Sequence, residues 1–173
     1  MITTEAAPVV QPAVRRRPTA GTAALVVTVL AALLVVFGSE PFTVRSDSMT
    51  PTLRAGDQLL AEKVSPRLHR FARGDVVVLE PPGSQDALMV KRVVALAGDR
   101  VGLADGRLVV NGTRVQEAYV DLATVDGVYF GPVVVPSGAL FVMGDNRAVS
   151  VDSRDFGAVP EDRVVGRMVL KLW

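Results

Sequence analysis

The sequence contains no cysteine and only one histidine, and these two shortages restrict its chemistry. Without cysteine there is no disulfide, no thiolate metal site and no cysteine nucleophile. One histidine is too few for the usual zinc sites, and no HExxH motif occurs, so no metal is expected. That residue, His69, lies in a polar stretch typical of a solvated loop, which disfavours a Ser-His-Asp triad.

The sequence also lacks an excess of charge of either sign, because 19 Lys and Arg residues face 18 Asp and Glu residues. A nucleic-acid partner is therefore not expected, since such a surface carries a basic stripe. Hydrophobic residues make up 49% and charged residues 21%, which excludes a disordered chain. The 173 residues are enough for one compact domain and a short additional segment.

Charged residues are missing throughout the stretch from Pro18 to Ser39, and this apolar run predicts a membrane anchor. A helix that crosses a bilayer needs about 20 such residues. Arginines 15–17 precede the run, which by the positive-inside tendency places the N-terminus in the cytoplasm. A cleavable signal peptide is disfavoured because its apolar stretch is about 7–15 residues and an A-x-A pattern would follow. A buried core helix is disfavoured because the run has no polar face.

The predicted organisation therefore has three parts along the chain. Residues 1–17 form a cytoplasmic tail, residues 18–39 a transmembrane signal anchor, and residues 40–173 an extracytoplasmic domain. Within that domain, short Val- and Leu-rich runs between turn residues predict strands at 76–79, 88–96, 107–110, 131–135, 140–143 and 164–172. Asn111-Gly112 is a strong hairpin signal. The predicted fold class is mainly β, with antiparallel sheets, and about residues 99–135 form a small inserted lobe.

Two segments carry residues suited to nucleophilic catalysis. Ser46 and Ser48 follow the apolar run directly, although serine pairs are also common in turns. Lys91 lies inside a predicted strand and shares one face with Met89 and Val93. If that face is buried, desolvation lowers the lysine pKa, and a neutral amine can take a proton from a serine hydroxyl. A lysine paired with a carboxylate, or one reaching out at the sheet edge, explains the pattern equally well at this point.

A dense polar turn runs from Gly144 to Arg154 between two apolar strands. Its many hydrogen-bonding side chains suit a buried layer that supports a site. An exposed turn held by its own side chains is the default alternative for any such stretch.

Four segments, taken together, resemble bacterial type I signal peptidases, the peptidase S26 family. They are S-D-S-M-T-P-T-L at 46–53, R-G-D-V-V at 73–77, K-R-V-V-A-L-A-G-D at 91–99 and G-D-N-R-A-V-S-V-D-S-R at 144–154. They occur in the family's order after a signal anchor, and the resemblance covers about residues 40–173. It implies an antiparallel β-sheet catalytic domain of the signal peptidase type, preceded by one N-terminal transmembrane helix.

The resemblance also implies a role for each matching residue. Ser48 is the nucleophile and Lys91 the general base, while the Ser46 hydroxyl and the Ser48 backbone N–H form the oxyanion hole. Ser150 orients the Lys91 amine. The residues expected to give structural support, the last two as an ion pair, are Asp145, Asn146, Asp152 and Arg154. The residues expected to bind substrate in shallow pockets are Phe42, Val44, Met49, Leu53, Met89 and Val90.

The implied activity is hydrolysis of one peptide bond in exported preproteins, after small residues in an Ala-x-Ala pattern, without metal or organic cofactor. The implied partners are the signal peptides of these preproteins and the lipid bilayer, and the chain is expected to act as a monomer. A specialised relative with few substrates and an inactive membrane-anchored binding homologue are the alternatives. A self-cleaving repressor-type Ser/Lys protease is disfavoured, because the predicted anchor is incompatible with a DNA-bound role.

Four residues depart from the family pattern. Ala95 and Ala97 stand where Gly and Pro are usual, Arg45 stands where Pro is usual, and Asp47 stands where Gly is usual. The Asp47 carboxylate either faces Lys91 and raises its pKa, or points away from it, since neighbouring residues of a strand face opposite sides.

Overall fold

The computed structural model describes residues 38–63, 70–83, 87–125 and 127–172, together with five helical residues between 21 and 29. The chain divides into two units, residues 1–33 and 34–173. In the first unit, the Thr28 hydroxyl donates to the Ala24 carbonyl at 3.0 Å. The predicted tail at 1–17, and most of the predicted anchor at 18–39, lie outside the described residues. Within the described part, no helix is long and apolar enough to cross a membrane.

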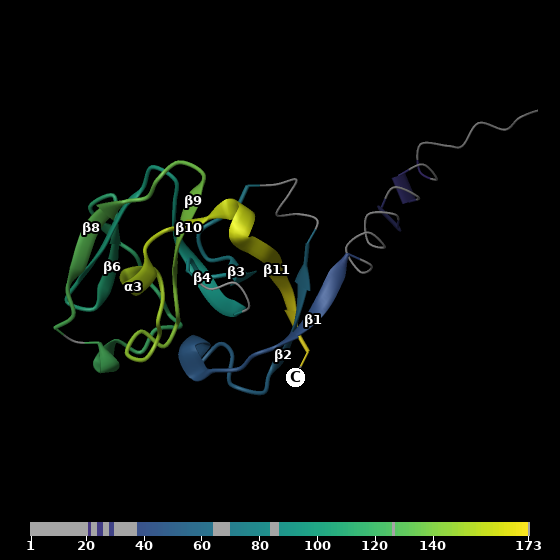
Figure 1. Ribbon diagram of the computed structural model, residues 1–173, viewed down its shortest axis with the longest axis horizontal. Helices are drawn as coiled ribbons and strands as arrows, with labels where there is room; N and C mark the ends of the chain where they lie inside the picture. Colours follow the sequence, from purple (N-terminus) through teal and green to yellow (C-terminus); the bar gives the residue numbers. More distant parts are fainter. Residues whose placement is uncertain are drawn as a thin grey trace, which may run out of the picture. The chain divides into compact units, whose positions relative to one another are not determined.

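Residues 34–173 contain two antiparallel β-sheets (Figure 1), so the mainly β antiparallel fold predicted from the sequence is confirmed. The first sheet has the strand order β1-β2-β11-β3-β4-β9-β10. Its strands are β1 (Ser39–Thr43), β2 (Gln58–Glu62), β3 (Val76–Leu79), β4 (Met89–Leu96), β9 (Ala139–Met143), β10 (Val159–Pro160) and β11 (Val164–Lys171). The second sheet, of order β7-β6-β5-β8, contains β5 (Arg100–Ala104), β6 (Arg107–Val110), β7 (Thr113–Arg114) and β8 (Phe130–Val134).

Each of the six predicted runs contains a strand, with ends at or next to the predicted positions. Asn111 and Gly112 have φ values of 54° and 80°, the left-handed conformations that a tight hairpin turn between β6 and β7 requires. The second sheet falls within residues 99–135, the predicted lobe. The sequence did not indicate β5, because Gly102 weakens the strand pattern of this short segment. Pairing with β6 on one side and β8 on the other stabilises β5 in the fold.

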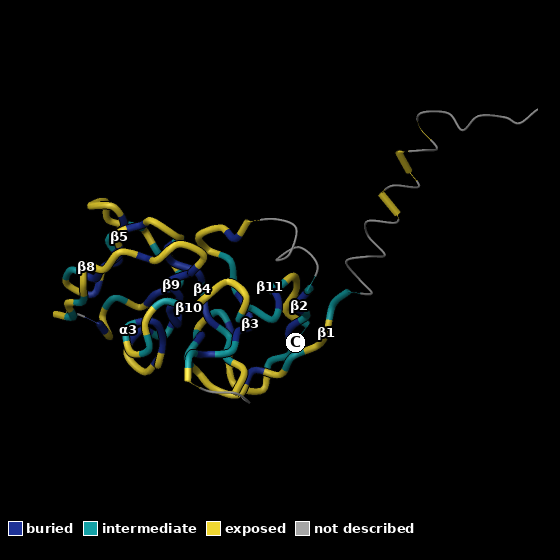
Figure 2. Tube along the Cα trace, turned by 45° about the horizontal axis from the view of Figure 1, so that its top comes forward, coloured by how far each residue is buried: buried dark blue, intermediate teal, exposed yellow. Residues whose placement is uncertain are grey.

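Helical structure in the described part of this unit is limited to short turns. These are η1 (Asp47–Met49), η2 (Leu122–Thr124), α3 (Ser153–Phe156) and η3 (Glu161–Arg163). The strands carry the core, and all five residues of β9 are buried (Figure 2), because apolar side chains cover both of its faces. One face packs in a cluster with β3 residues, and the other packs against β5 and β6 of the second sheet.

Candidate active site

Ser48 lies in η1, a single turn that buried apolar neighbours attach to the first sheet. Met49 and Leu53 are fully buried in a cluster with residues of β2 and β3. The backbone N–H of Asn146 donates to the Ser48 carbonyl at 3.0 Å, and the Asn146 amide donates to the Asp47 carbonyl at 3.2 Å. The backbone around Ser48 is therefore held by the apolar cluster and by the hydrogen bonds from Asn146, which fixes the position of the Ser48 hydroxyl.

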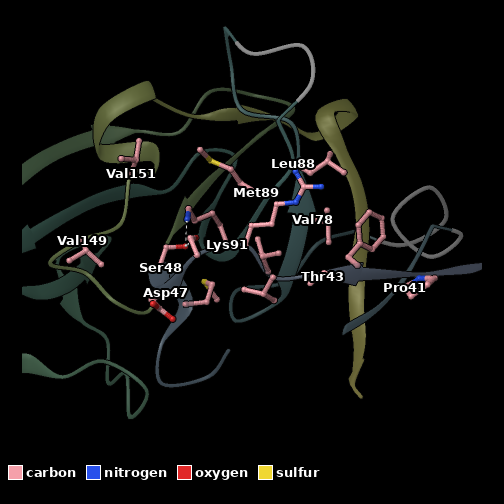
Figure 3. Close-up of a pocket in the computed structure, with 16 residues that line it drawn as sticks. Pro41, Thr43, Asp47, Ser48, Val78, Leu88, Met89, Lys91, Val149 and Val151 are labelled. Carbon is pink, nitrogen blue, oxygen red and sulfur yellow. Dashed lines mark hydrogen bonds between the residues drawn. The ribbon is translucent and has the colours of Figure 1, made fainter. Parts of the chain in front are cut away.

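Lys91 lies on β4, opposite Val77 of β3, and is only 3% exposed. Its Nζ lies 2.7 Å from Ser48 Oγ (Figure 3), although 43 residues separate the two in sequence. Burial lowers the pKa of Lys91 below its ordinary value. The Asp152 and Asp145 carboxylates oppose this shift, and the Arg154 guanidinium reinforces it. The amine is thereby biased towards the neutral form, which accepts a proton.

The two residues that precede Ser48 differ in what they contact. The Ser46 hydroxyl donates to Ser48 Oγ at 3.2 Å, so the two hydroxyl groups lie side by side. The Asp47 carboxylate accepts a hydrogen bond from the Ala55 backbone N–H at 3.0 Å. The charged groups that shift the Lys91 pKa are Asp152, Arg154 and Asp145. Of the two orientations considered for Asp47, the structure therefore has the one directed away from Lys91.

The turn of residues 144–154 closes the site from the other side. Ser150 Oγ is buried and has no hydrogen-bond partner among the described residues, so the expected hydrogen bond to Lys91 is not made. Gly144 lies between Ser150 and the Ser48 backbone, and a Cβ at this position would overlap both Ser150 Oγ and the Ser48 carbonyl. Only a glycine lets the two segments approach this closely, which keeps Ser150 against the site without a direct contact to the amine.

Asp152 supports this turn from a fully buried position. Its carboxylate accepts hydrogen bonds from the Gly144 N–H at 3.0 Å and from Arg154 Nε at 2.9 Å, the predicted ion pair. Although burial opposes the shift, the bonds from Arg154 and Gly144 hold the pKa of Asp152 below its usual value. Arg154 also donates to the carbonyls of Arg147 and Ser150 at 2.8 and 3.2 Å. These contacts join the two ends of the turn.

A groove of about 540 Å³ runs over the Ser48–Lys91 contact. Five of the six predicted substrate-binding residues line it, namely Phe42, Val44, Met49, Met89 and Val90. Leu53 differs from the expectation, because its side chain is fully buried in the cluster beneath η1 and does not line the groove. Among the residues that the structure describes, no group of three or more His, Asp or Glu side chains could hold a metal ion.

Comparison with known proteins assigns the family. A family model described as signal peptidase, peptidase S26, matches residues 18–173. The chain belongs to this family. It is accordingly a peptidase of the signal peptidase type.

Individual relatives agree with the family match over most of the chain. Signal peptidase I of Bacillus licheniformis is 40% identical over 153 residues, which cover 83% of this chain and 82% of the relative. A probable signal peptidase I-2 of Synechocystis is 35% identical over 156 residues, covering 84% and 71%. A crystal structure of a signal peptidase I from Enterococcus faecalis aligns with a TM-score of 0.52 and 29% identity, covering 58% of this chain and 98% of that one.

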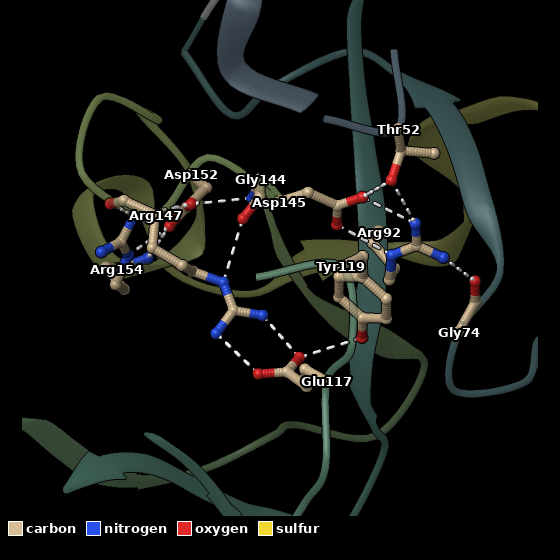
Figure 4. A network of polar contacts seen from close by, with 10 residues as sticks. All are labelled: Thr52, Gly74, Arg92, Glu117, Tyr119, Gly144, Asp145, Arg147, Asp152 and Arg154. Carbon is tan, nitrogen blue, oxygen red and sulfur yellow. Dashed lines mark hydrogen bonds and ion pairs between the residues drawn. The ribbon is translucent and has the colours of Figure 1, made fainter. Parts of the chain in front are cut away.

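Four further residues of this family member form a polar network behind the site (Figure 4) that the sequence did not indicate. Arg92 forms two hydrogen bonds to Asp145, at 2.8 and 2.6 Å, and its guanidinium lies 3.9 Å from the centre of the Tyr119 ring. The Tyr119 hydroxyl donates to Glu117 at 3.0 Å, and burial together with Glu117 raises the Tyr119 pKa. Glu117 also accepts two hydrogen bonds from Arg147, at 2.8 and 2.5 Å.

The sequence offers some indication of two of these four residues and none of the other two. Arg92 and Arg147 stand inside the matched segments at 91–99 and 144–154, so their buried roles could have been suspected. Glu117 and Tyr119 come from the connection after β7, which has no motif. Their position beside the turn of residues 144–154 depends on how the second sheet packs.

Proposed function

We propose that the chain removes N-terminal signal peptides from exported preproteins, with Ser48 as the nucleophile and Lys91 as the general base. The observation that carries this proposal is the 2.7 Å contact between Lys91 Nζ and Ser48 Oγ. Burial lowers the pKa of that amine, so a larger fraction of it is neutral and free to take a proton. The name signal peptidase I, borne by relatives 40% identical to this chain, supports the substrate class.

The reaction proceeds through an ester of Ser48. The neutral Lys91 amine takes the Ser48 proton as Oγ attacks the scissile carbonyl carbon. The Ser48 backbone N–H and the Ser46 hydroxyl donate to the resulting oxyanion. The Lys91 ammonium returns the proton to the leaving amine as the C–N bond breaks. Lys91 then takes a proton from a water molecule that attacks the ester carbon, and it gives that proton to Ser48 Oγ as the acyl C–O bond breaks.

The proposal includes a preference for small side chains on the acyl side of the cut bond. An extended peptide presents alternate side chains to one wall, and a sheet edge binds its backbone. The apolar side chains of Phe42, Val44 and Val90 line the groove. Cleavage after an Ala-x-Ala pattern is the proposed specificity, and the apolar lining of the groove supports it.

The proposal includes a membrane anchor at residues 18–39, which would hold the site near the membrane surface where the cleavage site emerges. Its support is the charge-free run and the arginines that precede it. Because the chain has no cysteine, single introduced cysteines report topology directly. In intact cells, a membrane-impermeant maleimide is expected to label Asp105→Cys and to leave Ala6→Cys unlabelled. If only Ala6→Cys is labelled, the N-terminus lies outside the cell and the proposed topology is wrong.

Cleavage by the full chain in detergent tests the chemistry. With a purified preprotein, the wild type is expected to release the mature chain after Ala-x-Ala, as N-terminal sequencing of the product would establish. Ser48→Ala and Lys91→Met are expected to fold and to leave the preprotein intact. Cleavage of only a few among many preproteins would favour the specialised relative. No cleavage by the wild type would contradict the proposal and favour the binding homologue.

A further inference from the structure

The catalytic groove continues past Ser48 to a pair of valines. Figure 3 shows Pro41 and Thr43 on one side of the Ser48–Lys91 contact, and Val149 and Val151 on the other. Val149 is 64% exposed and Val151 is 56% exposed. Single exposed apolar residues are ordinary on protein surfaces. Two of them on one turn, both lining a catalytic groove, indicate a contact surface.

The turn presents these two side chains in a fixed position. They flank Ser150, which is buried, and the Ser150 and Val149 N–H groups donate to the Asn146 carbonyl at 3.1 and 3.3 Å. Arg154 donates to the Ser150 carbonyl at 3.2 Å. The backbone under the valines is therefore hydrogen-bonded. Valine side chains are also stiff, because their branched Cβ restricts χ1, so a ligand that contacts them orders little that was free.

The direction in which the substrate lies in the groove indicates which part of it contacts Val149 and Val151. In the proposed function, the acyl side of the peptide lies along Phe42, Val44 and Val90. An extended peptide crosses the Ser48–Lys91 contact once, so its leaving side continues past Ser48 along the groove. Val149 and Val151 line the groove on that side of the contact.

We infer that Val149 and Val151 bind the first residues of the mature chain and favour apolar over polar side chains there. This inference rests on the proposed function. The substrates that this chain processes best would then be preproteins with an apolar residue shortly after the cleavage site. An apolar side chain placed against the two valines removes apolar surface from water on both partners, and a polar one loses hydration without a matching hydrogen bond.

A peptide series with the full-length chain in detergent tests this preference. All peptides share the same residues before the cut, ending in Ala-x-Ala. After the cut, the first, second and third positions carry either Val or Asn, one position at a time. Asn is uncharged, so the Asp47 carboxylate in the groove does not enter the comparison. At one or more of these positions we expect kcat/KM to be about tenfold higher with Val, the discrimination typical of a small apolar contact.

The variant Val149→Thr/Val151→Thr keeps the shape of both side chains and makes them polar. We expect it to lose most of the preference for Val, chiefly because kcat/KM falls for the Val peptides. Val134→Thr is the matched control, because Val134 lies on β8 outside the groove and is 63% exposed, close to Val149. It is expected to keep the full preference.

Three results would overturn the inference. The first is a wild-type enzyme that cleaves the Val and Asn peptides equally well at all three positions. The second is a double variant that slows every peptide alike. The third is a double variant that behaves as wild type on peptides but fails only with lipid vesicles, which would make the valines a membrane contact. If the wild type cleaves no peptide of the series, the proposed function itself fails and this inference with it.

Discussion

Lys91 is a titratable residue, and its burial disfavours the charged form of its amine. Its pKa in the folded chain lies below the ordinary value of 10.5. Between these two pKa values the unfolded chain binds a proton that the folded chain does not, so stability rises with pH through that window. Lys91→Met keeps much of the side-chain volume and removes the amine. We expect this variant to be inactive, and to gain stability relative to wild type at pH values below the window.

That gain is expected to shrink as the pH rises towards about 10.5, where the unfolded lysine also loses its proton. The lost hydrogen bond to Ser48 offsets about 1 kcal/mol, so the trend with pH is a better test than the absolute difference. Melting temperatures of both proteins from pH 6 to 10 measure it. Lys63→Met, at a more exposed lysine paired with Glu40, serves as the control. A constant or widening gap would show that Lys91 is charged in the free enzyme.

Removal of the Ser46 hydroxyl tests its proposed role in the oxyanion hole. Its Oγ lies 3.2 Å from Ser48 Oγ, near where charge develops in the reaction. We expect Ser46→Ala to lower kcat by roughly 10²–10³-fold and to leave KM little changed, as for the loss of one donor in other hydrolases. Ser46→Thr retains the hydroxyl and is expected to keep most of the activity. An effect of Ser46→Ala on KM alone would assign Ser46 to substrate binding.

At the scale of elements, the turn of residues 144–154 and η1 meet at Gly144. A Cβ there would overlap Ser150 Oγ and the Ser48 carbonyl, so Gly144→Ala forces the two segments apart. We expect the free energy of unfolding to fall by about 1–3 kcal/mol, the usual cost of overpacking, and cleavage to be lost because Ser48 shifts relative to Lys91. Urea denaturation and the preprotein assay measure the two effects.

Two comparison variants separate the effects of Gly144→Ala. Adding Ser150→Gly removes one overlap and is expected to restore part of the stability, but not the activity, because the Ser48 carbonyl still blocks the new methyl group. Gly166→Ala is a milder control, since a Cβ there would approach no atom closer than 3.0 Å. Full activity in Gly144→Ala would mean that η1 tolerates displacement.

At the scale of the whole catalytic part, a buried ion pair joins the connection after β7 to the turn of residues 144–154. The Arg147 and Glu117 side chains are 1% and 3% exposed. Glu117→Gln would leave the Arg147 charge buried without a counter-ion, which typically costs about 3–5 kcal/mol. We expect a loss of this size in the free energy of unfolding, together with lower kcat, because neighbouring Asn146 holds the Ser48 carbonyl.

The double variant Glu117→Gln/Arg147→Met tests the origin of that loss. It removes the unpaired charge, so we expect it to be more stable than Glu117→Gln alone in urea denaturation. A double variant that is less stable by the sum of the two single effects would show that the two side chains do not interact. Added salt is expected to change these differences little, because buried pairs are screened much less than exposed ones.

Local features of this chain could be predicted from its amino-acid sequence. Short runs rich in Val and Leu between turn residues predict strands, because β-branched and apolar side chains suit a buried strand. Asn111 and Gly112 predict their hairpin because these residue types adopt a positive φ readily. The matched segments predicted the Asp152–Arg154 ion pair, which the structure contains, and they proposed Ser48 and Lys91 as the reacting residues. Each of these features depends on residue type and on neighbours a few positions away.

The contacts between distant residues could not be predicted in this way, because they depend on the fold. The distance between Ser48 and Lys91 depends on η1 packing on the first sheet, and the orientation of Asp47 depends on the Ala55 amide. Leu53 belongs to the core because η1 turns it inward, although its motif suggested the groove. Glu117 reaches Arg147 only because the second sheet packs against β9. Contacts between segments far apart in sequence arise from the packing of whole elements, and short-range patterns carry no record of that packing.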